Sequence, residues 1–288
     1  MTCKILLLVL LTASLARAEA FTTGSRRASF FSRAKDVSAT LAEPSSSTIP
    51  SWEELQALLK KNDKKEDVQP LVTLFRDTNG WCPFCERVWL ALEIKQIPYQ
   101  EQLINLQDKP AWFKQMVPTA LVPAVLLHTD QMTPKANAEE TAAPERSLIW
   151  ESLDILKALD EKFPDTPRLV LDDREDYLEA RAIASKATTA GVQLLYGGRN
   201  GTVTEEERAQ KKEAFVAALR ELDAFLGTQH KEGPFCLGET VTGVDIEMIP
   251  TMERWRYQLP ITANLNLYDA DQFPNIVRWF DALDQYEP

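Results

Sequence analysis

Histidine and cysteine are scarce in this chain, which has two histidines and four cysteines among 288 residues. So few histidines leave little material for a histidine-rich metal site, and four cysteines are too few for a disulfide scaffold at this length. Basic residues are also short, with 32 lysines and arginines against 43 acids and a net charge of −11. This balance excludes a dominantly basic surface, and we do not expect a nucleic-acid partner. The 44% hydrophobic content predicts instead a globular chain, and 288 residues are enough for about two domains.

The first 50 residues have the composition of a targeting segment. A short apolar run after Lys4 is followed by small-residue cleavage sites that end at Ala20, as in a secretory signal peptide. The run is shorter than the roughly 20 residues of a membrane-spanning helix. In the transit-like linker at 21–50, residues 21–35 carry four basic and no acidic side chains. We predict a signal peptide at residues 1–20 and delivery to a plastid through the secretory route, with simple secretion as the alternative.

Residues 51–165 are predicted to form an α/β domain. Apolar side chains at helical spacing, from Phe84 to Lys95, predict a helix with one buried face that includes Phe84. A short helix is expected around Trp112 and Phe113, and a further one over 153–159. The expected strands are residues 71–75, 99–104, 124–127 and 147–150. The resulting order is β-α-β-α-β-β-α.

A polar stretch at residues 128–146 interrupts this domain. It contains two prolines and is too long for a tight hairpin, so we interpret it as a surface insertion.

Residues 166–288 are predicted to form an all-helical second domain. The strand pattern disappears after the joint at 163–168. The expected helices are residues 172–195, 205–226, 242–255 and 273–283. The fold class is therefore an α/β domain followed by a helical bundle.

One pair of cysteines has the spacing of a reactive site, Cys82-Pro83-Phe84-Cys85. A lone C-x-x-C is also half of a zinc site, but the second half, another Cys or His pair at ligand spacing, is missing from the sequence. A redox site requires a strand before it and a helix after it, and the pattern predicts both. Cys236 stands alone in an apolar context, which favours a buried and inert thiol. We predict redox chemistry and no bound metal.

Cys82 is the better candidate for the reactive sulfur. It lies where the helix is expected to begin, and Pro83 suits the first helical position because its missing donor costs nothing there. The unpaired N–H groups and the positive end of the helix dipole stabilise a thiolate, which is the nucleophilic form. Cys85 lies one turn further on, and is either a resolving cysteine or a packed bystander.

Four ordered motifs resemble the cysteine-active glutathione transferases, which include the omega, lambda and dehydroascorbate-reductase classes. They are Trp81-Cys82-Pro83-Phe84-Cys85-Glu86-Arg87, Ile104-Asn105-Leu106 with Asp108-Lys109-Pro110, Leu121-Val122-Pro123-Ala124 and Trp150-Glu151-Ser152. Thr242-Gly243-Val244-Asp245 resembles that family's capping box in the second domain. The resemblance covers about residues 70 to 285. It implies a thioredoxin-like first domain and a helical second domain, the glutathione transferase fold.

The resemblance also implies where glutathione binds. Pro123 is expected to be cis, which would turn the backbone of Val122 outward to pair with the cysteinyl part of glutathione. Glu151 and Ser152, at a helix start, would hold the γ-glutamyl group. Lys109 would meet the glycyl carboxylate. Phe84 belongs to the same predicted glutathione site.

Further candidates are less specific. Tyr196, Trp255 and Tyr257 are candidates for the second-substrate site, although an aromatic residue on a helix more often belongs to the core. The resemblance leaves a monomer and a homodimer open.

A cysteine at the active position implies thiol–disulfide exchange with glutathione as co-substrate. The expected substrates are small or protein disulfides and dehydroascorbate. The alternative is a non-catalytic carrier that holds an apolar ligand in the cleft between the domains. Membrane insertion of the segment after Val88, as in related chloride-channel proteins, is disfavoured because Glu93 and Lys95 make it a poor span.

Overall fold

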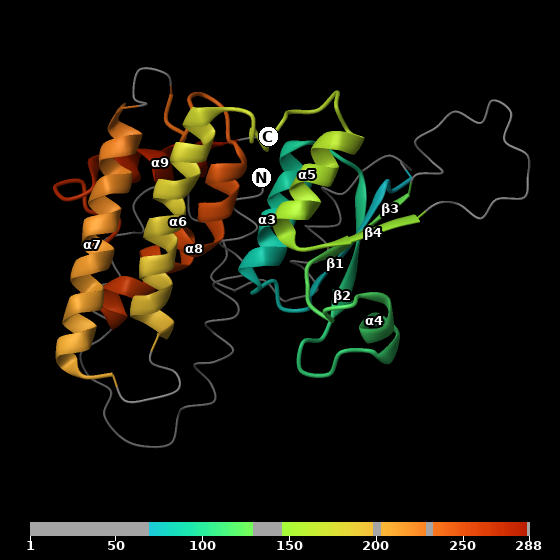
Figure 1. The fold of residues 1–288 in the computed structure, drawn as a ribbon, viewed down its shortest axis with the longest axis horizontal. Coiled ribbons are helices and arrows are strands. Elements are labelled where there is room, and N and C mark those ends of the chain that lie inside the picture. The colour runs from blue at the N-terminus through green and yellow to red at the C-terminus, as the bar shows by residue number, and fades with distance from the viewer. Residues whose placement is uncertain (1–68, 129–145, 198–202, 229–232, 287–288) are drawn as a thin grey trace, which may run out of the picture. The chain divides into compact units, whose positions relative to one another are not determined.

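A mixed four-stranded sheet organises the first half of the folded chain. The computed structural model describes residues 69–128, 146–197, 203–228 and 233–286. The predictions for the targeting segment, and for most of the 128–146 insertion, lie outside these residues. In chain order the elements are β1 (Val72–Asp77), α3 (Pro83–Ile94), β2 (Tyr99–Ile104), α4 (Ala111–Met116), β3 (Ala124–His128), β4 (Arg146–Trp150) and α5 (Ser152–Lys162) (Figure 1). The predicted order β-α-β-α-β-β-α is confirmed.

The strands lie in the order β2-β1-β3-β4. β1 and β2 are parallel, which the intervening α3 allows, whereas β3 is antiparallel to both β1 and β4. The insertion bounds shift by one residue at each end, because His128 pairs with Arg146 as the last rung of the β3–β4 ladder.

Each face of the sheet is covered by helices. Val72 and Leu74 of β1 pack with Val88 of α3 and Ile155 of α5 in the main core. The alternate residue Phe75 packs on the opposite face in a small cluster with Phe113 of α4 and with Ile104, Val117 and Ala124. Alternation along β1 thus sends successive side chains to two layers of helix.

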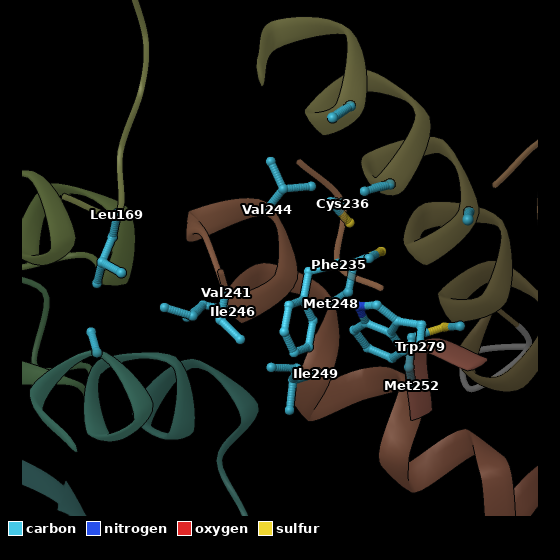
Figure 2. Close-up of a cluster of buried hydrophobic side chains, with 14 of the residues drawn as sticks. Leu169, Phe235, Cys236, Val241, Val244, Ile246, Met248, Ile249, Met252 and Trp279 are labelled. Carbon is cyan, nitrogen blue, oxygen red and sulfur yellow. The ribbon is translucent and has the colours of Figure 1, made fainter. Parts of the chain in front are cut away.

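The second half is helical, as predicted, with α6 (Glu175–Tyr196), α7 (Glu205–Thr228), α8 (Gly243–Thr262) and α9 (Pro274–Gln285) (Figure 1). Phe235 and Trp279 lie in one buried cluster with Met248 and Met252 of α8 (Figure 2). The predicted capping box at the start of α8 is present. The Thr242 side chain accepts the backbone N–H of Asp245, and the Asp245 carboxylate accepts the backbone N–H of Thr242. Asp245 also accepts hydrogen bonds from the backbone N–H of Cys236 at 3.0 Å and from Trp279 Nε1 at 2.9 Å.

α8 runs further than the predicted end at residue 255. It continues through Pro260 to Thr262. The reason is that Met248, Met252, Trp255 and Leu259 form one buried stripe, and the gain from burying Leu259 outweighs the backbone hydrogen bond that Pro260 cannot make.

The prediction that Phe84 lies on the buried face of α3 is wrong. Its side chain is 50% exposed, and the Arg87 guanidinium lies 5.1 Å from its ring centroid. Its spacing fits the buried face, but in the first turn of α3 the buried residues are Cys85 and Glu86, at 2% and 3% exposed, and not Phe84. Cys85, Val88 and Leu92 form that face instead.

α3 connects the two halves, because it packs against both α5 and α8. Lys95, at the end of α3, is buried and donates to Asp160 of α5 at 2.7 Å and to the carbonyl of Pro167 at 2.8 Å. Asp160 also accepts the backbone N–H groups of Leu169 and Val170, at 3.0 and 2.7 Å for its Oδ2 atom. The joint between the halves is thereby held by hydrogen bonds. Within the described residues, none of the helices combines the length and the apolar character that crossing a membrane requires.

Candidate active site

Cys82 occupies the N-cap position of α3, as the sequence predicts. Its backbone is extended, with φ −72° and ψ 114°, and Pro83 is the first helical residue. The carbonyl of Cys82 accepts the N–H of Glu86 at 3.1 Å and so begins the helix. The Cys82 side chain is partly exposed, whereas Cys85, one turn later, is 2% exposed. The structure therefore presents one accessible sulfur and one enclosed sulfur on the same helical turn.

The surroundings of Cys82 favour its thiolate. A hydrogen bond from the Cys85 thiol lowers the pKa of Cys82 to about 7, against the opposing effect of burial, and the backbone N–H groups of Cys85 and Phe84 assist. The pKa of Cys85 moves upward, because its proton is held by the Cys82 sulfur and its own thiolate would be buried. Above about pH 7 the pair therefore carries its negative charge on Cys82, and the remaining proton stays on Cys85.

Asp77 is a site residue that the sequence analysis missed. It ends β1, is 2% exposed, and accepts the N–H of Trp81 at 2.7 Å and that of Cys82 at 3.2 Å. A carboxylate oxygen of Asp77 and the sulfurs of Cys82 and Cys85 lie within 4.8 Å of one another. The available signal was an acid that closes an apolar strand five positions before the reactive cysteine.

These three donor atoms are close enough to attract a soft metal ion. We interpret them as a thiol site, because a structural zinc site closes with four protein ligands and no fourth Cys, His or acid joins this group within the described residues.

The peptide bond between Val122 and Pro123 is cis, as the resemblance implied. The carbonyl oxygen of Val122 lies 3.9 Å from Cys82 Sγ, so the turn before β3 borders the Cys82 sulfur. Lys109 supports this turn by donating to the carbonyl of Ala120 at 2.7 Å.

Glu151 and Ser152 lie at the junction of β4 and α5. Glu151 has a positive φ of 68° and is exposed, and Ser152 is the buried first residue of the helix. A positive φ in a residue other than glycine is uncommon, and such conformations concentrate at binding sites. The N-terminus of α5 offers unpaired backbone N–H groups of the kind that bind carboxylates.

Arg254 of α8 reaches the segment that carries Cys82. Its Nη1 lies 2.6 Å from the carboxylate of Glu86, and its Nη2 donates to the carbonyl of Trp81 at 3.2 Å. The guanidinium also lies 5.4 Å from the centroid of the Trp81 ring. Sequence reasoning missed this contact, because Trp81 and Arg254 are 173 residues apart.

Two models of the glutathione S-transferase family match the chain. The N-terminal domain model matches residues 81–162 and the C-terminal domain model matches residues 205–282, so that together they cover more than half of the chain. Glutathione S-transferase DHAR2 of Arabidopsis thaliana is 31% identical over 176 residues, which are 61% of this chain and 68% of the relative. The chain belongs to the glutathione S-transferases.

Other members of the family are also similar to the chain. Chloroplastic glutathione S-transferase DHAR3 of Arabidopsis thaliana is 26% identical over 67% of this chain and 62% of its own length. Among solved structures, the omega 3C glutathione transferase of Trametes versicolor superposes with a TM-score of 0.60 at 23% identity, over 80% of this chain and 92% of its own. The dehydroascorbate reductase of Chlamydomonas reinhardtii has a TM-score of 0.56 at 23% identity, over 75% and 89% of the two chains. These two structures support the glutathione transferase fold.

The second-substrate candidates of this glutathione S-transferase differ in burial: one lies in the core and two are exposed. Trp255 is a core residue, which corrects its assignment: it is 1% exposed and its ring packs edge to face on Phe215 at 5.4 Å. Gly191 shows how tightly it packs, since a Cβ there would lie 2.4 Å from the Trp255 ring. Tyr196 and Tyr257 are exposed, and their role stays a prediction.

Proposed function

We propose that this glutathione S-transferase is a glutathione-dependent thiol transferase that works through a mixed disulfide on Cys82. The observation that carries the proposal is an accessible sulfur at the start of α3 whose pKa is lowered to about 7. A thiol with this pKa is about half ionised at pH 7 and remains a good nucleophile.

The reaction follows from thiol–disulfide exchange. The Cys82 thiolate attacks the glutathionyl sulfur of a mixed disulfide, and the substrate thiolate leaves and takes a proton from water. The thiolate of a second glutathione then attacks the same glutathionyl sulfur. Glutathione disulfide is released, and Cys82 returns as a thiolate.

The residues around Cys82 suit the three parts of glutathione. Val122, next to the sulfur, would pair with the cysteinyl backbone as an added strand does. The N-terminus of α5 would hold the γ-glutamyl carboxylate through Ser152, with Glu151 facing the ammonium group. Lys109 already donates to the turn before Val122, so a role toward the glycyl carboxylate requires it to exchange or share that bond.

The relatives narrow the substrates and the compartment. We propose disulfides and dehydroascorbate as oxidised substrates, since one solved structure with the same fold is named dehydroascorbate reductase and the glutathione S-transferase N-terminal domain model matches this chain. Several relatives are named chloroplastic, which supports the plastid proposal.

A carrier function is the second candidate. Trp81, Phe84 and Leu121 flank Cys82 and Val122 in the sequence and are each about half exposed. Such an apolar rim suits an apolar ligand as well as an apolar part of a disulfide substrate.

Reduction of hydroxyethyl disulfide by glutathione separates the two candidates. We expect turnover by the wild type, loss of turnover in Cys82→Ser, and turnover near the wild-type level in the matched control Cys236→Ala, a buried cysteine of the helical half. A second assay with dehydroascorbate tests the substrate class. Absence of turnover in the wild type with both substrates would leave the carrier function, and equal turnover in Cys82→Ser would remove Cys82 from the mechanism.

A further inference from the structure

The buried carboxylate of Asp77 lies where its negative charge disfavours the thiolate form of Cys82. Its negative charge raises the pKa values of both Cys82 and Cys85. A neutral asparagine or serine accepts backbone N–H groups without this penalty. The two backbone hydrogen bonds to Asp77 therefore do not by themselves explain a carboxylate at this position.

The role of Cys85 changes when Cys82 is glutathionylated. In the free protein the Cys85 proton is held by the Cys82 sulfur. Once that sulfur is bonded to glutathione it carries no charge and is a poor hydrogen-bond acceptor. The Cys85 thiol is 2% exposed and has little access to water, so its proton needs another acceptor inside the protein.

Asp77 has the capacity and the position to be that acceptor. A carboxylate has about four lone-pair sites, and within the described residues two of them are used, by the N–H groups of Trp81 and Cys82. One of its oxygens lies within 4.8 Å of the Cys85 sulfur. A side-chain rotation or one bridging water closes that distance, and catalytic hydrogen bonds are often this long before the substrate binds.

We propose that Asp77 accepts the proton of Cys85 and thereby lets Cys85 resolve a mixed disulfide on Cys82. The Cys85 thiol gives its proton to the Asp77 carboxylate, and its sulfur attacks Cys82 Sγ. The Cys82–glutathione bond breaks, a Cys82–Cys85 disulfide forms, and the glutathione thiolate leaves and takes the proton from Asp77.

The electrons balance over the two steps. The protein loses two electrons as its two sulfurs become a disulfide, and glutathione disulfide is reduced to two glutathione thiols. Excess glutathione reverses the oxidation by thiol–disulfide exchange. The inference rests on the proposed function only in requiring that Cys82 accept a glutathionyl group.

The test follows single turnovers by intact mass. The protein is mixed with glutathione disulfide, quenched in acid at successive times, and assayed for the glutathionyl adduct and for the internal disulfide. In the wild type the adduct rises and then decays into the internal disulfide. In Asp77→Asn we expect the adduct to form and its decay to slow by about 100-fold, the size of a general-base contribution. The exposed control Asp165→Asn, in the turn after α5, decays as the wild type does.

Variants that lack the Cys85 thiol distinguish proton transfer to Asp77 from a structural role of Asp77. Cys85→Ser and the double variant Asp77→Asn/Cys85→Ser retain the adduct, and added glutathione should release it from both at rates within about twofold, since Asp77 acts through the missing thiol. Decay of the Asp77→Asn adduct at the wild-type rate overturns the proposal. The proposal is also overturned if glutathione releases the adduct from the double variant about 100-fold more slowly than from Cys85→Ser. Absence of any adduct in Cys85→Ser, which cannot resolve it, contradicts the proposed function itself, and this outcome does not bear on the role of Asp77.

Discussion

Arg254 of α8 and Glu86 of α3 form an ion pair with 2.6 Å between Nη1 and Oε2, and their side chains are only 10% and 4% exposed. Burial raises the pKa of Glu86, while the Arg254 charge acts in the opposite direction. The pair lies directly behind the Cys82 turn, because Glu86 follows Cys85 and Arg254 also binds the carbonyl of Trp81. The helical half of the protein therefore supports the segment that presents the reactive sulfur.

Removing one member of this pair should destabilise the fold strongly. Arg254→Met leaves the Glu86 carboxylate buried without its partner, and we expect a loss of about 3 kcal/mol in the free energy of unfolding. Replacing both residues, with Arg254→Met and Glu86→Gln, should recover part of that loss because the uncompensated charge is gone. Urea denaturation of the single and double variants measures both effects.

The exposed pair of Lys186 and Glu221 is the matched control. Its side chains are 62% and 44% exposed, so Lys186→Met should cost below about 1 kcal/mol. A similar loss in both single variants would mean that burial of the Arg254 pair has no energetic importance.

Glu253, the neighbour of Arg254 in α8, predicts a pH dependence of stability. Burial, followed by the charges of Glu86 and Asp284, raises its pKa to about 7 from the ordinary value of 4.5. Between these two values the folded protein binds more protons than the unfolded chain, so this residue makes stability fall as pH rises from about 4.5 to about 7. Glu253→Gln removes that contribution.

The expected result is a pH-dependent stabilisation by Glu253→Gln. The variant should differ little from the wild type near pH 4.5 and be more stable above pH 7 by on the order of 3 kcal/mol, since one pKa unit corresponds to about 1.4 kcal/mol. Urea denaturation from pH 4.5 to 8 measures the difference. A constant difference at every pH would show that Glu253 does not titrate in this range.

Cys85 sets the pH at which Cys82 becomes reactive. Its thiol is the main cause of the lowered pKa of Cys82, so Cys85→Ala should move the midpoint of Cys82 alkylation upward by about one pH unit. The rate of iodoacetamide labelling, followed by site-resolved mass spectrometry across pH 5 to 10, reports this midpoint. Asp77→Asn should move it downward, because a negative charge next to the thiolate is lost. Shifts of the same sign in both variants would contradict the assigned electrostatics.

The sequence predicted the elements whose signals are local. Strand alternation, helical spacing and the C-x-x-C motif were enough to place α3 after β1 with Cys82 at its start. The capping box was likewise visible, because Thr242 and Asp245 are three residues apart and act on the same helix turn.

The errors and omissions concern residues whose environment is built from distant segments. Phe84 has the right spacing for the buried face, but burial also depends on what covers the end of the helix. Trp255 is in the core because Phe215 and Gly191 pack around it, and neither is its neighbour in sequence. The Arg254–Glu86 pair joins α8 to α3, and no local pattern signals such a pairing.

Ser152 offers a test of the glutathione site that leaves Cys82 untouched. We propose that the hydroxyl of this buried first residue of α5 binds the γ-glutamyl carboxylate, so Ser152→Ala removes one hydrogen bond to a charged group. Such a bond contributes about 1.5–3 kcal/mol, and KM for glutathione should rise by about tenfold or more, with kcat at saturating glutathione nearly unchanged. The alkylation rate of Cys82 should also remain at the wild-type value, because Ser152 is not among the groups that shift its pKa. Ser185→Ala, at an exposed position of α6, is the matched control and should change neither constant. An unchanged KM in Ser152→Ala, with thermal unfolding like that of the wild type, would remove the start of α5 from the binding site.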